Sequence, residues 1–222
     1  MKSAIFDLDG TLADTSGDLI AAANACFVKI GIPPQLDPIA DASTAFQGGR
    51  AMLKLGFARL GQIPDDSQMQ QHYEYLLKSY GENIEHHTFL YAGVVDCLEE
   101  LSRRGYLLGI CTNKPEGLAQ TLTKRLGIRN HFAALLGADS LAVRKPDAGH
   151  LLGTIKELGG NPSKSVLIGD TITDRNAAKN AWVPCVLVTF GPDGRYVADL
   201  EPEGLLDHYN DLPDMLDGMI KT

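Results

Sequence analysis

The sequence has only four cysteines, and no two of them are close together in the chain. They lie in four separate apolar stretches, at Cys26, Cys97, Cys111 and Cys185. Zinc sites and redox dithiols usually contain closely spaced cysteine pairs such as CxxC, so neither kind of site is indicated. We therefore interpret the four cysteines as small buried hydrophobic side chains, and we expect the protein to reside in a reducing compartment.

Long apolar runs and an excess of positive charge are also missing. No apolar run reaches the roughly 18 residues that a membrane-spanning helix needs, and residues 1–10 carry acids where a secretory signal is apolar. The 20 basic residues are outnumbered by 28 acidic ones, which gives a net charge of −8. Such a chain repels phosphate backbones and anionic lipid. We therefore expect a soluble cytoplasmic protein that binds neither nucleic acid nor membranes.

Apolar residues make up 44% of the sequence, enough for a sizeable core, and their spacing changes along the chain. A strand-like run at 3–6 is followed only by helical spacing, at about 15–30, 50–60 and 67–80. The first of these helices should end at Gly31–Pro34, because glycine and proline stop helices. The N-terminal part therefore predicts one strand and then an all-helical block.

From about residue 90 onward, predicted helices alternate with apolar strands. The strands lie at 107–111, 134–136, 166–168 and 185–188, and the helices at about 93–104, 116–126, 147–158 and 174–181. Continuous apolar strands between helices are typical of a parallel sheet covered on both faces. We expect the C-terminal tail to cover one edge of the sheet as a last helix, with Leu205, Leu206, Leu212, Met215, Leu216 and Met219.

This pattern predicts an α/β fold, a Rossmann-like parallel sheet flanked by helices, with an inserted all-helical domain. One strand cannot bury itself alone, so the strand at 3–6 belongs with the C-terminal sheet. We expect residues 1–14 and 92–222 to form the α/β core and residues 15–91 to form the insertion.

Polar residues follow successive predicted strands at their carboxyl ends, where open parallel sheets bind ligands. In chain order these are Asp7 and Asp9, then Thr112, Asn113 and Lys114, then Lys145, and finally Asp170 and Asp174. Each set alone has an ordinary explanation, such as a helix cap or carboxylates at a helix N-terminus. All four sets together indicate a site. The six histidines are scattered, and we expect surface or core positions for them.

Four motifs carry a family resemblance, namely DLDGT at 7–11, TNK at 112–114, KP at 145–146 and GDxxxD at 169–174. They resemble the haloacid dehalogenase superfamily, specifically its phosphoglycolate phosphatase-like branch with a helical C1-type cap. The resemblance covers essentially the whole chain and implies that residues 15–91 are that cap. It departs at Trp182-Val183, where relatives commonly place a glycine.

The resemblance implies a role for each motif residue. Asp7 would attack phosphorus to form an aspartyl-phosphate, and Asp9 would act as general acid and then general base. The transferring phosphoryl group would be held by Thr112, Lys145, Asn113 and Lys114. For Lys114, a solvated loop position is an equal alternative.

The resemblance also implies a bound Mg²⁺, a hard cation that accepts carboxylate and phosphate ligands together. Its ligands would be the Asp7 side chain, the Asp9 backbone carbonyl and Asp170, with Asp174 in or near the shell. In the cap we expect Gly48, Gly49 and Arg50 to face the substrate, with Arg50 available for a carboxylate. A solvated arginine at a helix start is the alternative.

The expected function is Mg²⁺-dependent hydrolysis of a small phosphorylated metabolite, with 2-phosphoglycolate the first substrate to test. Asp9 argues against carbon-attacking dehalogenases and against phosphonatases, which lack an acid there, although Lys54 lies in a suggestive cap stretch. Sugar phosphomutases carry a histidine where this chain has Leu19. A phosphosugar or nucleotide phosphatase and a catalytically silent phosphate-binding module stay open as alternatives.

Overall fold

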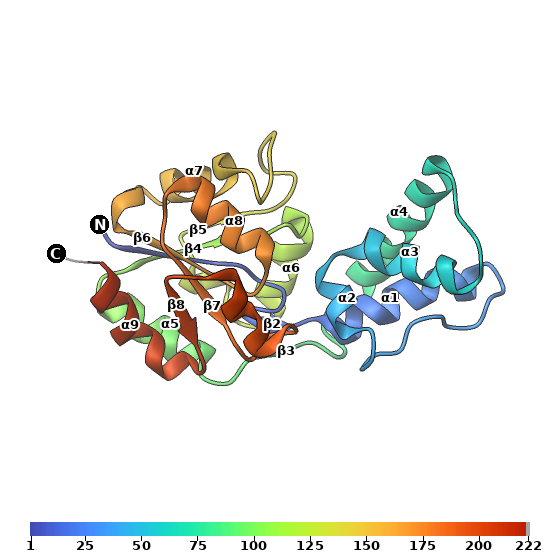
Figure 1. Ribbon diagram of the computed structural model, residues 1–222, viewed down its shortest axis with the longest axis horizontal. Coiled ribbons are helices and arrows are strands. Elements are labelled where there is room, and N and C mark those ends of the chain that lie inside the picture. Colours follow the sequence, from blue (N-terminus) through green and yellow to red (C-terminus); the bar gives the residue numbers. More distant parts are fainter. Residues whose placement is uncertain (221–222) are drawn as a thin grey trace. The chain divides into compact units, whose positions relative to one another are not determined.

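The computed structural model describes residues 1–220, which form two compact units (Figure 1). One unit combines Met1–Ala13 with the chain from Leu90 onward, and the other is Asp14–Phe89. The sequence predicts unit boundaries at 14/15 and 91/92, and the structure divides the chain at 13/14 and 89/90, one and two residues earlier. The chain crosses between the units in two short strands that pair with each other, β2 (Ala13–Asp14) and β3 (Phe89–Leu90).

A six-stranded parallel sheet forms the centre of the first unit, in the order β5-β4-β1-β6-β7-β8. Its strands are β1 (Ser3–Phe6), β4 (Leu107–Cys111), β5 (Ala134–Leu136), β6 (Ser165–Gly169), β7 (Cys185–Val188) and β8 (Gly204–Leu206). β1 lies between β4 and β6, with Phe6 opposite both Ile110 and Ile168. The residues that follow these three strands therefore emerge side by side, and the predicted α/β class is confirmed.

Helices cover both faces of this sheet. They are α5 (Val94–Arg103), α6 (Glu116–Arg125), α7 (Ala148–Glu157), α8 (Ile172–Ala181) and α9 (Leu212–Met219). Figure 1 shows α7 and α8 on one face and α5 and α9 on the other. Alternate residues of β1 face opposite sides, and Ile5 packs into the fully apolar cluster under α7 and α8 with Leu151, Ile155 and Ala177. Burial of this cluster is the main stabilising contribution to the unit.

The C-terminal tail differs from the sequence-based expectation. Leu205 and Leu206 belong to the edge strand β8, not to a last helix, and the α-helix of the tail begins only at Leu212, after a short 3-10 turn at Tyr209–Asp211. β8 pairs in parallel with β7, with Val186 opposite Gly204. A Cβ atom on Gly204 would lie 2.6 Å from the terminal methyl group of Met219, so α9 packs closely on this strand.

The second unit consists of α1 (Ser16–Lys29), α2 (Ala42–Phe46), α3 (Gly49–Arg59) and α4 (Asp66–Glu82). α2 was not expected from the sequence, because five residues are too short to show a helical period. Phe27 of α1 packs on Phe57 of α3 with ring centroids 5.0 Å apart. A Cβ atom on Gly56 would lie 2.3 Å from the Phe27 ring, so this glycine permits the close packing of the two helices. In the part of the chain that the structure describes, no helix is both long and apolar enough to cross a membrane.

Candidate active site

Three carboxylates converge at the carboxyl ends of β1 and β6. Asp7 follows β1, Asp170 follows β6, and Asp174 lies in the first turn of α8. One oxygen of each lies within 4.8 Å of the others. The Asp7 amide donates to the Ile168 carbonyl at 2.8 Å, which extends the pairing of the two strands and brings the first two carboxylates together. Asp170 and Asp174 are fully buried.

Lys145 places an ammonium group among these carboxylates. Its Nζ lies 2.6 Å from Asp174 Oδ1 and 3.0 Å from Asp7 Oδ2, and the residue is only 2% exposed. Burial by itself would lower the pKa of Lys145, but the carboxylates of Asp174 and Asp7 outweigh it and raise the pKa above its ordinary value. The group is therefore positively charged at neutral pH.

One ammonium does not balance three carboxylates, of which Asp170 and Asp174 are fully buried and Asp7 is partly buried. Burial is the main cause that raises the pKa of Asp7 to about 6, although Lys145 opposes it. Burial, followed by the charges of Asp174 and Asp7, raises the pKa of Asp170 well above its ordinary value. Asp170 Oδ1 accepts a hydrogen bond from Thr11 Oγ1 at 2.7 Å, whereas Asp170 Oδ2 is buried without a hydrogen-bond partner among the described residues.

The donor set fits a hard divalent cation. A buried carboxylate oxygen without a partner needs a proton or a cation, and several carboxylate oxygens in one place are what Mg²⁺ and Ca²⁺ prefer. Asp7 and Asp170 can offer such oxygens. Both oxygens of Asp174 are already engaged, Oδ1 by Lys145 and Oδ2 by the Thr171 hydroxyl at 2.8 Å and by the amides of Thr171 and Asp170. The geometry of Asp174 therefore favours a role in holding Lys145 over direct coordination of the cation.

Asp9 lies beside a second lysine. Lys114 Nζ lies 2.7 Å from Asp9 Oδ1, and the lysine side chain is 4% exposed. Lys114 follows β4, whose register with β1 brings the two loops together. The alternative of a solvated loop lysine is therefore wrong, because Lys114 is buried.

Thr112 and Asn113 sit in the same loop but differ in their surroundings. Thr112 is buried, and its Oγ1 accepts a hydrogen bond from the Lys114 amide at 3.2 Å. Asn113 is exposed, and its side-chain amide donates to the Lys145 carbonyl at 2.9 Å. The contact of either residue with a phosphoryl group stays a prediction.

Gly48, Gly49 and Arg50 all have roles within the helical unit. Gly48, with a φ of +97°, precedes α3, and a Cβ atom on Gly49 would lie 3.0 Å from the Tyr73 ring of α4. Arg50 is exposed, donates to Gln70 and lies over the Tyr73 ring with its guanidinium carbon 4.6 Å from the centroid. Their contact with substrate stays a prediction, as does any role of Lys54.

Sequence reasoning missed three residues that support the site. Thr11 lies inside the DLDGT motif and Thr171 inside GDxxxD, so the motifs themselves were a signal for both. His150 is buried in α7 and accepts a hydrogen bond from the Lys145 amide. A lone histidine in an amphipathic helix carries no sequence signal for that contact.

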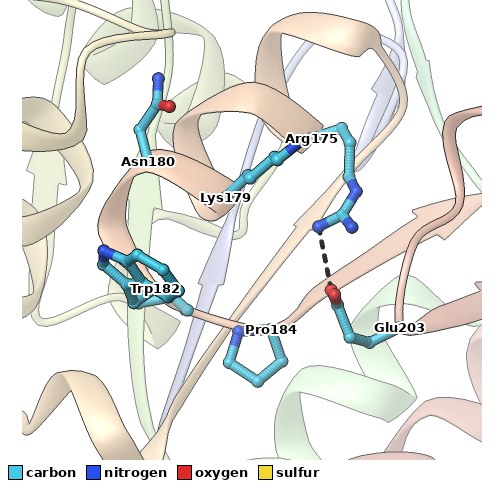
Figure 2. A pocket seen from close by; sticks show the side chains of 7 residues that line it. Arg175, Lys179, Asn180, Trp182, Pro184 and Glu203 are labelled. Carbon is cyan, nitrogen blue, oxygen red and sulfur yellow. Dashed lines mark hydrogen bonds and ion pairs between the residues drawn. The ribbon is translucent and has the colours of Figure 1, made fainter.

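A separate pocket of about 570 Å³ lies at the C-terminal end of α8 (Figure 2). It is lined by Arg175, Lys179, Asn180, Trp182, Val183, Pro184 and Glu203. Arg175 pairs with Glu203 at 3.1 Å, as the dashed line in Figure 2 marks. None of the converging carboxylates lines this pocket, so it is distinct from the candidate active site.

The chain resembles known proteins over nearly its whole length. It is 39% identical to a phosphoglycolate phosphatase of Agrobacterium fabrum over 208 residues, covering 93% of this chain and 88% of the relative. It is 36% identical to a phosphoglycolate phosphatase of Mesorhizobium japonicum, covering 94% and 91%. A crystal structure of a predicted phosphoglycolate phosphatase from Haemophilus somnus 129PT superposes with a TM-score of 0.86 at 25% identity, covering 97% of each chain.

The chain also matches a family model, that of the haloacid dehalogenase-like hydrolases. The model matches residues 4–188, from the first strand to the end of β7, and so includes every motif described above. The match spans well over half of the chain, and the protein therefore belongs to the haloacid dehalogenase-like hydrolase family.

Proposed function

We propose that the protein is a Mg²⁺-dependent phosphatase that hydrolyses small phosphomonoesters through an aspartyl-phosphate on Asp7. The observation that carries this proposal is the position of Asp7, 3.0 Å from the buried Lys145 ammonium and within 4.8 Å of an Asp170 oxygen. Asp170 Oδ2 has no hydrogen-bond partner among residues 1–220. A nucleophile next to a fixed cation and a site for a second one can approach an anionic phosphoryl group. The similarity to phosphoglycolate phosphatases supports 2-phosphoglycolate as the substrate.

In the first step one Asp7 oxygen forms a bond to phosphorus while the bond from phosphorus to the leaving oxygen breaks. The Leu8 amide donates to Asp7 Oδ1 at 2.7 Å and thereby fixes the orientation of the carboxylate. Asp9 gives a proton to the leaving oxygen. Lys145 and the Thr112 hydroxyl stabilise the charge on the phosphoryl oxygens.

In the second step Asp9 takes a proton from a water molecule, the water oxygen bonds to phosphorus, and the bond to Asp7 breaks. Lys114 holds the Asp9 carboxylate in place for both proton transfers, through the contact at 2.7 Å. Asp7, Asp170 and the Asp9 carbonyl would hold Mg²⁺. When bound there, Mg²⁺ neutralises the repulsion between the carboxylates and the phosphate.

We further propose that residues 14–89 are the cap that selects the substrate, with Arg50 binding a carboxylate. The four buried free cysteines support action in the reducing cytoplasm.

The test is a panel of phosphomonoesters with Mg²⁺, ranked by kcat/KM. Preference for 2-phosphoglycolate over neutral esters is expected, and Arg50→Ala should reduce kcat/KM for acidic esters only. Phosphate release from no member of a broad panel would favour a silent binding module, and an equal loss on acidic and neutral esters would remove the role of Arg50.

A further inference from the structure

Three side chains from three separate elements hold the main chain at Lys145 and Pro146. The Lys145 amide donates to His150 Nδ1 of α7 at 3.3 Å, and Asn113, after β4, donates to the Lys145 carbonyl at 2.9 Å. Asn180, near the end of α8, donates to the Pro146 carbonyl at 3.0 Å, and Figure 2 shows its amide directed away from Trp182. Both main-chain polar groups of Lys145 are thus bound by side chains.

His150 has the most buried position of the three. It is fully buried, and its Nε2 lies 3.0 Å from the Gly137 carbonyl. Because a carbonyl only accepts, Nε2 carries the proton and Nδ1 is the acceptor for the Lys145 amide. The neutral ring therefore connects the two ends of the irregular segment 137–147, which joins β5 to α7.

The contact of His150 with the Lys145 main chain matters because the Lys145 ammonium must lie at a defined place between two carboxylates. A lysine side chain has four rotatable bonds, and residues 137–147 form no helix or strand that would fix its Cα atom. The Nζ nevertheless lies between Asp7 and Asp174, at 3.0 and 2.6 Å. Misplacement of a reacting or stabilising group by about 1 Å can cost roughly 100-fold in rate.

We propose that His150, Asn113 and Asn180 are positioning residues that fix the Lys145 main chain and so hold its ammonium against the nucleophile, with His150 the principal one. This assignment rests on the proposed function, since the place of Lys145 affects turnover only if Asp7 reacts. His150 and Asn180 need not touch the substrate for this role, whereas the predicted contact of Asn113 with the phosphoryl group is a separate role of that residue.

Two variants of His150 separate its two contacts. In His150→Asn the side-chain oxygen can take the place of Nδ1 and accept from the Lys145 amide, while the contact with Gly137 is lost. In His150→Gln the amide reaches the Nε2 position and keeps only Gly137. We expect kcat to fall about 10- to 100-fold in His150→Gln with little change in KM, and to stay within about threefold of the unsubstituted protein in His150→Asn.

A second readout is independent of turnover. Acetic anhydride labelling, followed by mass spectrometry, reports how accessible Lys145 is, with the exposed Lys179 as internal reference. Lys145 should label faster in His150→Gln than in His150→Asn. This readout still tests the positioning if no phosphomonoester is hydrolysed, so the two proposals can fail separately.

Asn113→Ala and Asn180→Ala test the same assignment without a change in the core, because both residues are exposed. Each should lower kcat about 3- to 10-fold, whereas the exposed Asn130→Ala should have no effect. Three results would each overturn the proposal. The first is an equal loss of kcat in His150→Asn and His150→Gln, and the second is a Lys145 labelling rate that follows only the thermal stability of the variants. The third is full activity of both Asn113→Ala and Asn180→Ala.

Discussion

A buried carboxylate is a poor nucleophile unless its neighbours hold its charge and its orientation. Asp7 has both, through Lys145 Nζ at 3.0 Å and the Leu8 amide at 2.7 Å. The pKa of Asp7 is still raised to about 6, because burial outweighs the attraction of Lys145. The metal-free site thus makes this carboxyl group easier to protonate than a free aspartate, and a divalent cation would favour the reactive anion. Asp7→Asn should therefore abolish phosphate release, by about 1,000-fold or more, since the amide cannot form the acyl-phosphate. The melting temperature of the metal-free variant at pH 7.5 should equal or exceed that of the unsubstituted protein, because a disfavoured charge is removed. Phosphate release and circular dichroism measure the two effects. Turnover at an unchanged rate would show that another residue is the nucleophile.

Thr11 offers a second prediction for a single side chain. Its hydroxyl is the donor to Asp170 Oδ1 at 2.7 Å, and both residues are fully buried. Thr11→Val keeps the shape but removes the donor, which should weaken Mg²⁺ binding about 10- to 100-fold. Thr11→Ser keeps the donor and serves as the control. Isothermal titration with Mg²⁺ distinguishes them, and equal affinities in both variants would contradict the orienting role of this hydroxyl.

The elements differ in how much of their structure the sequence reveals. The strand at 166–168 is apolar throughout and lies between two amphipathic helices, so it was predicted together with its neighbours. β8 was missed because three residues, Gly204–Leu206, show no period, and only pairing with β7 makes them a strand. The convergence of Asp7, Asp170 and Asp174 could be expected because their motifs follow neighbouring strands, and parallel pairing brings those strand ends together. Their roles stay predictions. The contact of Lys114 with Asp9 depends on how the loops after two different strands meet. The contacts of His150 depend on the path of the irregular segment 137–147. Residue spacing along the chain encodes neither. The end of α8 allows a test at this scale. Trp182 has a left-handed backbone with a φ of +57°, and the residue is 93% exposed at the pocket in Figure 2. Left-handed backbone costs a residue with a Cβ atom about 1 kcal/mol relative to glycine. Trp182→Gly should therefore be more stable than Trp182→Ala by up to about 1 kcal/mol, a difference of roughly 2–4 °C in melting temperature. Circular dichroism is the suitable probe, because Trp182 is the one tryptophan in the sequence. An alanine variant as stable as the glycine variant would show that the backbone at this position relaxes without cost.

Across the whole molecule the net charge of −8 and an anionic substrate are compatible, because the charge near the reacting group is set locally. Three carboxylates and one ammonium lie together, and two of the carboxyl groups, Asp7 and Asp170, have a raised pKa. At these two carboxyl groups the folded, metal-free protein thus binds more protons than the unfolded chain does above about pH 4. By linkage, the contribution of these two groups to stability should fall as the pH rises from the ordinary aspartate pKa of 3.8 through about 6. Mg²⁺ binds the deprotonated carboxylates, so its stabilising effect should be small at pH 5 and large at pH 7.5. At a concentration 100 times the dissociation constant, Mg²⁺ adds about 2.7 kcal/mol, which corresponds to roughly 5–10 °C in melting temperature. Thermal unfolding with Mg²⁺ and with EDTA at the two pH values measures this effect. Asp170→Asn is the matched control, because it removes one predicted ligand charge and should abolish the shift at pH 7.5. An Mg²⁺ shift that is the same at both pH values, or that persists in Asp170→Asn, would place the cation somewhere other than between Asp7 and Asp170.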